Sequence, residues 1–514
     1  MNHAIKNQPI LVIGGTGYVG GRLILRLLQA GYEVRATTRS ISKMRGRPWA
    51  DHPKLTIVQA DLHHYETLEK ALQDCRVAYY LVHSMMPEVS DFADADRHAA
   101  QNFIKAAKDS TLCRVIYLGG LGGENESASK HLKSRHEVGR ILQSGSVPTT
   151  IFQSAQILGS GSASFEILRY MAERLPFMIV PDQIMDTKIQ PICIRNVLNY
   201  LEGALECEET INQTFDIGGP EVITYRQLFN IYAAEAGIRK PVFINPPFRS
   251  NKFGRKFAFG LAKLILPIPA SISEPLLEGT PVPVFVKNER ITRIIPQKMM
   301  TCREAIRRAI QKDSLKIVDT RWTDAGALKP PEWMQIGDAP YAGGTLLQGG
   351  FKVKLSATPE EVWALIRRIG GNTGWYYGDR LWQLRGWMDQ IVGGVGLRRG
   401  RRHPENIFVG DALDFWRVLD VKPPRYLILL AEMKLPGEAI LEFQIVRIDD
   451  STELRIGTRF RPAGLYGILY WHILLPFHNL LFGGMLKTIA RLVGHSGIEG
   501  PHKFKPGPIS LDLN

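Results

Sequence analysis

The stretch Pro9-Ile-Leu-Val-Ile-Gly-Gly-Thr-Gly-Tyr-Val-Gly-Gly21 decides how the first half of this chain folds. Its residues 10–13 form a continuous apolar run, which is typical of a short strand buried on both faces of a sheet. Three glycines at three-residue spacing follow, and residues 22–28 then show the pattern of an amphipathic helix. A strand that turns through glycines into a helix predicts a pyrophosphate site. The glycines permit close backbone approach, and the helix N-terminus offers N–H groups to the anion.

The end of the second predicted strand favours one nicotinamide nucleotide over the other. Arg39 lies 19 residues after Gly20, where NAD-specific folds usually place an Asp or Glu for the ribose hydroxyls. An Arg at this position can bind a 2′-phosphate instead, and Lys43, Arg45 and Arg47 add positive charge close by. We therefore expect NADP rather than NAD, with a plain solvated basic loop as the alternative interpretation.

Strands and helices alternate through this half of the chain as in a doubly wound α/β domain. The predicted strands are residues 32–37, 55–59, 77–82, 114–118 and 149–152, and a helix is predicted over 91–108. Right-handed crossovers between them imply a parallel sheet. Asp61 follows the third of the chain's strands and is predicted to accept from the adenine amino group. His83 follows the fourth, where ribose and nicotinamide would lie, although a loop histidine that only fills space is the alternative.

Several of these segments resemble a known family. Gly14-Gly-Thr-Gly-Tyr-Val-Gly20, Thr38-Arg-Ser40, Ala60-Asp-Leu62 and Tyr117-Leu-Gly-Gly120 resemble the atypical short-chain dehydrogenase/reductases, near the NmrA-like, NAD-dependent-epimerase-like branch. Later segments, residues 189–197 and 215–226, are also similar to that branch. The resemblance covers residues 8–315 and implies a Rossmann-like fold that binds NAD(P).

The glycine motif and the resemblance together predict the cofactor contacts. They are Gly14, Thr16, Gly17, Tyr18, Val19 and Gly20 around the turn, then Arg39, Asp61, Leu62, His83, Gln153 and Ser154 along later strand ends. The last two are implied by the family, in which this loop passes the nicotinamide, so that both side chains could donate to the carboxamide.

The catalytic end departs from the family pattern. Standard members carry a Tyr and, four residues later on the same helix, a Lys that lowers the pKa of the Tyr hydroxyl. Here His131 and Arg135 stand at those positions, and the usual Ser after the fifth strand is replaced within the glycine-rich residues 119–123. His131 can serve as the acid/base, since the ordinary pKa of histidine suits proton transfer near neutral pH.

In that interpretation Arg135 holds the ribose, and Lys133 or Ser134 assists. In the alternative, the helix keeps its cofactor contacts but has lost redox chemistry, which leaves a nucleotide sensor or a scaffold.

Two apolar segments each allow two interpretations. Residues 163–186 could line a hydrophobic substrate pocket, although ordinary core explains such spacing too. Residues 252–269 combine basic and apolar side chains, which fits a helix that covers the substrate region or one that lies on a membrane surface.

The second half of the sequence predicts a separate domain. We assign residues 1–318 to the nucleotide domain with a substrate-side extension over 240–318, 319–347 to a linker, 348–505 to a second domain and 506–514 to a tail. A strand, a helix capped by Ser356 or Thr358, and strands at 411–421, 425–434, 438–449 and 452–461 precede a long helix over 463–494. This order resembles the START-like α+β helix-grip fold, which implies an apolar ligand cavity around the last helix.

Residues 464–486 are almost uncharged and long enough to span a membrane. A cavity helix gripped by a sheet must also be very apolar. Pro476, His472, His478 and Asn479 would be costly in lipid, which favours the cavity helix over membrane contact.

Composition narrows the classes of function. The 514 residues carry 64 Lys or Arg against 50 Asp or Glu, a formal charge of +14, which favours anionic partners. Residues 398–402 hold four arginines without interleaved aromatic residues, so we interpret them as a solvated basic face and expect no nucleic acid.

The cysteines and the N-terminus suggest a reducing compartment. The five cysteines include no CxxC pair, which predicts free thiols and no zinc site. No long apolar segment precedes the first strand, so we expect no signal peptide and a cytoplasmic location.

The sequence thus predicts an NADP(H)-binding oxidoreductase that acts on an apolar carbonyl, enol or quinone. A non-catalytic redox sensor and a membrane-associated lipid-binding protein are the alternatives, and the oligomeric state stays open.

Overall fold

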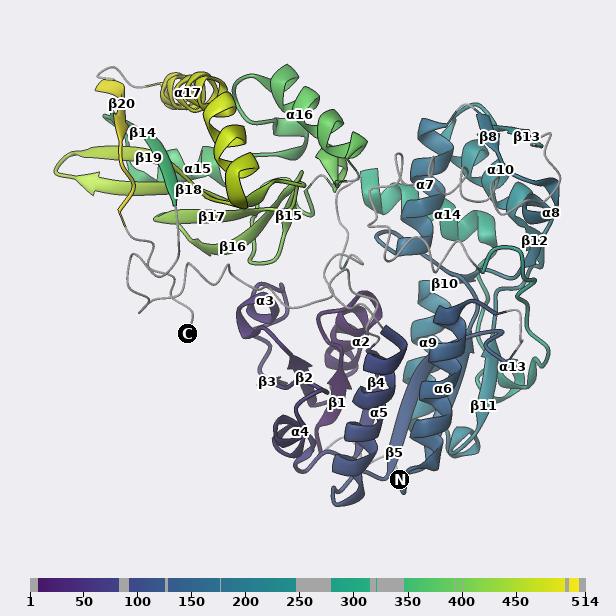
Figure 1. Ribbon diagram of the computed structural model, residues 1–514. Coiled ribbons are helices and arrows are strands. Elements are labelled where there is room, and N and C mark those ends of the chain that lie inside the picture. Colours follow the sequence, from purple (N-terminus) through teal and green to yellow (C-terminus); the bar gives the residue numbers. More distant parts are fainter. Residues whose placement is uncertain are drawn as a thin grey trace. The chain divides into compact units, whose positions relative to one another are not determined.

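The computed structural model describes residues 8–82, 92–124, 128–175, 177–245, 279–314, 320, 346–392, 394–399, 401–494 and 499–507. The chain divides into two compact units, Met1–Ala327 and Leu328–Asn514 (Figure 1). The boundary falls inside the predicted linker. His83 and the predicted amphipathic segment 252–269 lie outside the described residues.

A seven-stranded parallel sheet forms the centre of the first unit, in the order β11-β6-β5-β4-β1-β2-β3. Its strands are β1 (Ile10–Ile13), β2 (Val34–Thr38), β3 (Leu55–Gln59), β4 (Val77–Tyr80), β5 (Arg114–Gly120), β6 (Thr149–Ser154) and β11 (Thr214–Ile217). The strand order reverses between β1 and β4, so a crevice for a ligand is expected outside the carboxyl ends of these two strands. The predicted Rossmann-like, doubly wound sheet is confirmed.

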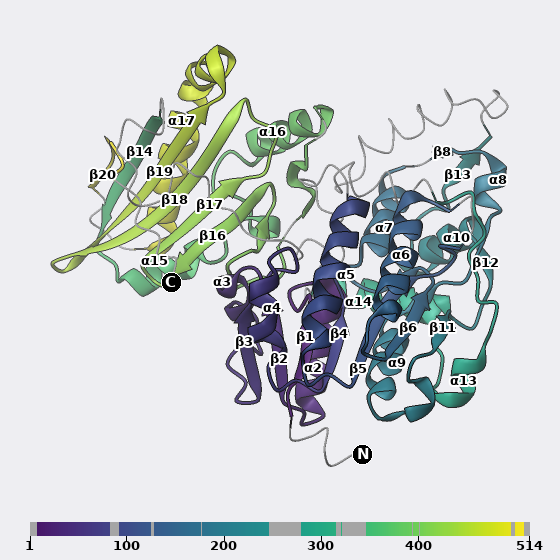
Figure 2. The ribbon, with the colours of Figure 1, turned by 60° about the horizontal axis from the view of Figure 1, so that its bottom comes forward.

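Helices cover both faces of this sheet (Figure 2). They include α2 (Tyr18–Gln29), α3 (Ile41–Arg45), α4 (Tyr65–Leu72), α5 (Phe92–Lys108), α6 (Lys130–Ser144) and α9 (Ile194–Glu206). Ile10 and Val12 face the core that α2 and α9 share, whereas Leu11 and Ile13 face the core of α4, α5 and α6. The unbroken apolar run at 10–13 therefore exists because alternate residues fill opposite cores.

The rest of the first unit is built from short elements. They are β7 (Ile157–Leu158), α7 (Ala163–Arg174), β8 (Phe177–Ile179), α8 (Asp182–Met185), β9 (Lys188–Ile189), β10 (Ile192–Cys193), η1 (Glu208–Thr210), β12 (Ile223–Thr224), α10 (Tyr225–Ala236), β13 (Val242–Ile244), α13 (Arg290–Ile294) and α14 (Cys302–Ser314). Phe165, Leu168 and Met178 of the predicted apolar wall are buried in the same core as Tyr232 of α10. These three residues therefore belong to the core, which is the second of the two interpretations given above for residues 163–186.

Thr320 belongs to the first unit although it lies in the predicted linker. Its hydroxyl donates to the carbonyl of Tyr18 (2.7 Å) and accepts from Nε of Arg22 (2.9 Å), and the residue is buried against the start of α2.

An antiparallel sheet forms the second unit, with strand order β15-β16-β17-β18-β19-β14-β20. Its elements are β14 (Leu347–Leu355), α15 (Pro359–Ile366), η4 (Gly371–Thr373), α16 (Asp379–Ile391), η5 (Gly396–Arg399), β15 (Ala412–Leu413), β16 (Trp416–Lys422), β17 (Tyr426–Ala431), β18 (Gly437–Ile448), β19 (Ser451–Pro462), α17 (Gly464–Val493) and β20 (Glu499–Phe504). The predicted cap of α15 is Thr358, which forms a capping box with Glu361. Neither α16 nor β20 was part of the sequence prediction.

The predicted solvated basic face is wrong for Arg401 and Arg402. Arg401 is buried and donates to the carbonyls of Arg367 (2.6 Å), Ile369, His403 (3.0 Å) and Asn406 (3.1 Å). Burial lowers the pKa of its guanidinium to about 10. Arg402 pairs with the buried Asp411 at 2.8 Å. These cations therefore hold the loop before β15 together instead of facing water.

Candidate functional site: a nucleotide crevice at the strand-order reversal

The glycine turn after β1 is too tight for side chains at two of its positions. Gly14 has φ +89°, and the N–H of Gly17 donates to its carbonyl (2.9 Å). A Cβ on Gly14 would lie 2.9 Å from the carbonyl oxygen of Leu81, which follows β4. A Cβ on Gly20 would lie only 2.3 Å from the carbonyl oxygen of Gly14. The turn thus brings α2 against β1 at the reversal of strand order.

The start of α2 presents backbone donors. Gly17 is its N-cap residue, with extended backbone and no side chain of the described residues capping it. The N–H of Gly21 donates to the Gly17 carbonyl (3.0 Å), so the N–H groups of Tyr18, Val19 and Gly20 precede the first bond of the helix. A Cβ on Gly17 would meet only the Gly14 carbonyl oxygen, at 3.2 Å. This cradle fits a pyrophosphate, which the donors and the helix dipole would hold.

A buried arginine supports the turn from α3's side. Arg47 is buried, and its Nη2 donates to the carbonyl of Thr16 (3.2 Å). Gly15 packs closely on Met44 of α3, because a Cβ there would lie 2.9 Å from the Met44 Cε. Of the basic residues predicted to add charge here, Arg47 thus contacts the turn directly, whereas Arg45 is exposed.

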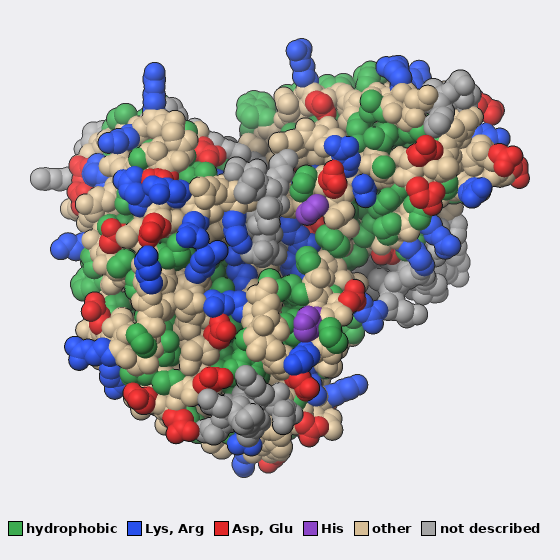
Figure 3. Space-filling view, turned by 180° about the vertical axis from the view of Figure 1, so that it is seen from behind, with side chains coloured by type: hydrophobic (Ala, Val, Ile, Leu, Met, Phe, Trp, Pro, Cys, Tyr) green, Lys and Arg blue, Asp and Glu red, His purple; other side chains and the backbone are tan. Residues whose placement is uncertain are grey.

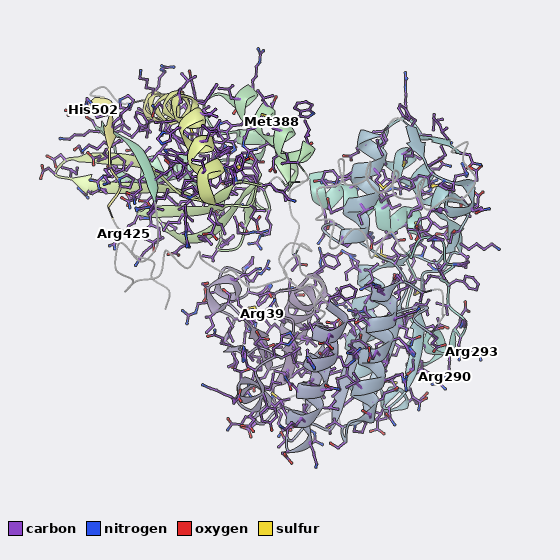
Figure 4. All side chains as sticks on the ribbon, in the orientation of Figure 1. Arg39, Arg290, Arg293, Met388, Arg425 and His502 are labelled. Carbon is purple, nitrogen blue, oxygen red and sulfur yellow. The ribbon has the colours of Figure 1, made fainter. Side chains whose placement is uncertain are left out.

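Arg39 follows the carboxyl end of β2. Its side chain is exposed beside α3 (Figure 4), while its carbonyl accepts from Nε2 of Gln59 (3.5 Å). Ser40 caps α3 by accepting from the N–H of Lys43 (3.4 Å). The short helix therefore fixes the backbone around Arg39 and leaves its side chain exposed at the surface.

Asp61 and Leu62 lie at the carboxyl end of β3. Oδ1 of Asp61 accepts from the N–H of His63 (3.0 Å), and the hydroxyl of Thr67 donates to the Asp61 carbonyl (3.0 Å). The Leu62 side chain is buried in the core with α4 and α5. The carboxylate of Asp61 keeps acceptor capacity for an adenine amino group, whereas Leu62 can contact a nucleotide only through its backbone.

The helix that carries the predicted catalytic residues begins at this same edge. Ser129 caps α6 by accepting from the N–H of Leu132 (3.4 Å), so His131 lies in the first turn, half-buried. Arg135, one turn later, donates through Nη2 to the carbonyl of Leu118. Its guanidinium lies over the ring of Tyr117 (5.6 Å). Part of the hydrogen-bonding capacity of Arg135 is therefore used by β5 instead of by a ribose.

The surroundings of Ser134 argue against the predicted assistance. Its hydroxyl donates to Oδ2 of Asp96 on α5 (3.0 Å), and both side chains are buried. Ser134 therefore joins α6 to α5, while Lys133 is exposed.

Two glycines at the end of β5 and just after it allow α6 to pack closely. A Cβ on Gly123 would lie 2.5 Å from the carbonyl oxygen of Leu132, and one on Gly120 would lie 2.7 Å from the Leu132 Cδ2. Helix α6 thus packs directly on this turn, in the space that side chains would need.

The end of β6 supplies a residue that the sequence prediction missed. Ser154 donates its hydroxyl hydrogen to the carbonyl of Ala155 (2.9 Å), so donation to a carboxamide would require this bond to break. Gln153 is half-buried beside it. Oε1 of Gln156 is buried without a hydrogen-bond partner among the described residues. Its place just beyond a parallel strand's carboxyl end was the available signal, because ligands bind at that edge.

The phenol of Tyr18 packs against neighbouring side chains. It is buried beneath the Arg22 guanidinium (4.7 Å), and burial raises its pKa to about 12. A Cβ on Gly159 would lie 2.5 Å from the Tyr18 Oη. Only the backbone of Tyr18 is then suited to contact a nucleotide. Within the described ranges no group of three His, Cys, Asp or Glu side chains could hold a metal ion.

The family comparisons agree with this geometry. Residues 14–156 match a family model described as NAD(P)H-binding, and residues 341–485 match one described as a protein of unknown function (DUF2867). The first unit therefore contains an NAD(P)H-binding domain, which supports a nicotinamide nucleotide as its cofactor. Preference for NADP, and the START-like assignment of the second unit, stay predictions.

Individual relatives are distant. Photosystem II assembly factor Ycf39 of Trieres chinensis is 23% identical over 258 residues, 49% of this chain and 76% of its own. Divinyl chlorophyllide a 8-vinyl-reductase of Cucumis sativus is 24% identical over 228 residues, 42% of this chain and 54% of its own. The chain thus spans about half of the second relative's length. A triphenylmethane reductase of Citrobacter sp. complexed with NADP(H) covers 59% of this chain and 99% of its own, at 18% identity and a TM-score of 0.48.

Proposed function

We propose that this protein is an NADPH-dependent reductase of an apolar carbonyl, enol or quinone. The observation that carries the proposal is the pairing of an open helix N-terminus at Gly17 with an exposed Arg39 at the end of the next strand. The N–H groups of α2 would hold the pyrophosphate, and Arg39 would bind the 2′-phosphate.

His131 is the proposed proton donor. When bound, a reduced nicotinamide supplies a hydride to the substrate carbon. His131 would give a proton to the substrate oxygen, so that the hydride and the proton together convert a carbonyl into an alcohol. Its position in the first turn of α6, at the carboxyl edge of the sheet, supports this role. Gln156 would orient the nicotinamide by accepting from the carboxamide N–H.

The test combines NADPH binding, read by cofactor fluorescence, with turnover against a panel of carbonyls and quinones. We expect His131→Ala to bind NADPH as the wild type does and to lose about a hundredfold or more in kcat. His98→Ala is the matched control, because His98 is an exposed histidine on α5. Equal turnover by wild type and His131→Ala would contradict the role of His131.

A redox sensor is the second candidate. It is favoured by the bond between Arg135 and the Leu118 carbonyl, which uses part of the hydrogen-bonding capacity that a role at the ribose would need. If wild type and His131→Ala bind NADPH equally and neither oxidises it with any compound of the panel, the sensor takes precedence.

A further inference from the structure

The second unit exposes a stripe of apolar side chains on α16. Leu384, Trp387, Met388, Ile391 and Val392 are each between 51% and 60% exposed. Their spacing puts them on one side of the helix, opposite the buried Trp382, Gly386 and Asp389. Met388 is labelled on this helix in Figure 4. An amphipathic helix ordinarily turns its apolar side to the core, so this stripe points to a partner.

A second stripe runs along the first half of α17. Tyr466, Leu469, Ile473, Phe477 and Leu480 are between 48% and 84% exposed and follow one another at three- or four-residue spacing. The same spacing continues to Lys487 and Arg491, which are exposed near the end of the helix. The stripe is therefore apolar along its first half and basic at its end.

The two helices are neighbours (Figures 1 and 2). Nη2 of Arg385 on α16 donates to the hydroxyl of Tyr470 on α17 (3.3 Å). A Cβ on Gly484 of α17 would lie 2.3 Å from the ring of Tyr377, just before α16. We call the two stripes together the apolar face.

Charge decides which partner fits the apolar face. Residues 454–498 contain no Asp or Glu, and Arg380 begins the stripe on α16. Asp389 of α16 is fully buried and accepts from the N–H groups of Gly396 (2.8 Å) and Lys434 (2.7 Å), so it adds no exposed acid. Figure 3 shows hydrophobic side chains at the surface of this unit, among Lys and Arg side chains and also among those of Asp and Glu. Two copies meeting through this face would bring like charges together, whereas an anionic surface complements it.

We propose that the apolar face binds the surface of an anionic lipid bilayer. The apolar side chains would enter the boundary between headgroups and acyl chains, with Trp387 and Tyr466 at the level of the headgroups. Arg380, Lys487 and Arg491 would attract the negative lipids. This inference does not depend on the proposed reductase activity.

The contact is peripheral. Helix α17 is long and apolar enough to span a membrane by length and composition, and only 33% of its most apolar window is buried, so burial alone does not decide between a span and a surface contact. Its second half packs into the core of the unit, where Met485, Leu486 and Ile489 have no exposed surface. A span would have to pull these residues out of the core.

The experiment is flotation of the full chain with vesicles of phosphatidylcholine alone or mixed with phosphatidylglycerol. We expect binding to the mixed vesicles to weaken about tenfold or more in the double variant Trp387→Ser/Ile391→Ser, which removes apolar area. The double variant Lys487→Gln/Arg491→Gln should lose about fivefold per charge on mixed vesicles and little on neutral ones. The control Val222→Ser/Val242→Ser changes equally exposed residues of the first unit and should bind like wild type.

Thermal unfolding and NADPH affinity identify a variant that has merely failed to fold. Equal vesicle binding by wild type and Trp387→Ser/Ile391→Ser would overturn the proposal, as would no binding to either vesicle type. A concentration-dependent dimer in sedimentation that the same variant abolishes would assign the apolar face to a second copy and overturn the lipid proposal as well.

Discussion

The two ends of the candidate nucleotide site are built in different ways. At the phosphate end, the contacts come from the backbone around Gly14, Gly17 and Gly20, and side chains are mostly excluded. At the chemical end, every candidate contact is a side chain: His131 and Gln156 among them. A backbone site can be read from residues that lack side chains, whereas a side-chain site depends on partners that are distant in sequence. The following predictions test whether this division holds.

Gly20→Ala should weaken NADPH binding more than any of the other substitutions discussed below. The added Cβ would lie 2.3 Å from a backbone oxygen, so α2 must move off the turn and the cradle opens. We expect NADPH affinity to fall about a hundredfold. The comparison is Gly483→Ala in α17, where a Cβ would meet nothing within 4 Å and affinity should stay unchanged. If Gly20→Ala binds NADPH normally in fluorescence titration, the backbone of the glycine turn does not form the phosphate end of the site.

Arg39→Gln tests the one side chain assigned to the phosphate end. Loss of a charge-assisted contact to the 2′-phosphate should weaken NADPH binding about tenfold and leave NADH binding unchanged. Arg45→Gln, an exposed arginine on the neighbouring α3, serves as control. Parallel losses for both nucleotides would instead indicate a general electrostatic effect and would remove the basis for NADP preference.

Gln156→Leu probes the chemical end directly. If its buried Oε1 accepts from the carboxamide, NADPH binding should weaken about fivefold, because the amide N–H loses its partner. The thermal midpoint of the nucleotide-free protein should not fall, since Leu removes a buried acceptor that has no partner among the described residues. Unchanged affinity together with a raised midpoint would mean that Gln156 does not contact the cofactor.

Ser134→Ala should have the smallest functional effect. It deletes a buried hydrogen bond to Asp96 and should lower the free energy of unfolding by about 1–2 kcal/mol, measured by urea denaturation. NADPH affinity and turnover should match those of the wild type. A selective loss of turnover would restore the assisting role that the Asp96 contact argues against.

The sequence alone was sufficient to predict features that depend on residues close together in the chain. The apolar run at 10–13, the glycine turn and the cap of α15 each involve neighbours in the chain; the first two have the predicted form, and of the two predicted caps, Ser356 and Thr358, the structure has Thr358. The alternation of such segments predicted the parallel, doubly wound sheet, which the structure shows with seven strands.

Non-local contacts account for what the sequence did not reveal. Arg401 lies in a run of arginines, which ordinarily face water, but carbonyls at residues 367 and 369 accept its hydrogen bonds. Likewise, nothing near Ser134 in sequence shows that Asp96 of α5 is its partner. Helix α16 is different, because its apolar residues at i, i+3, i+4 and i+7 are the periodicity of an amphipathic helix, so its signal was present in the sequence.

The glycine at position 123 has a consequence for the placement of α6. Because a Cβ there would come within 2.5 Å of the Leu132 carbonyl oxygen, α6 can keep its present position only while residue 123 lacks a side chain. That position also determines where His131 and Arg135 lie along the crevice. Any side chain at 123 would therefore push the start of α6 outward, and His131 and Arg135 would move with it.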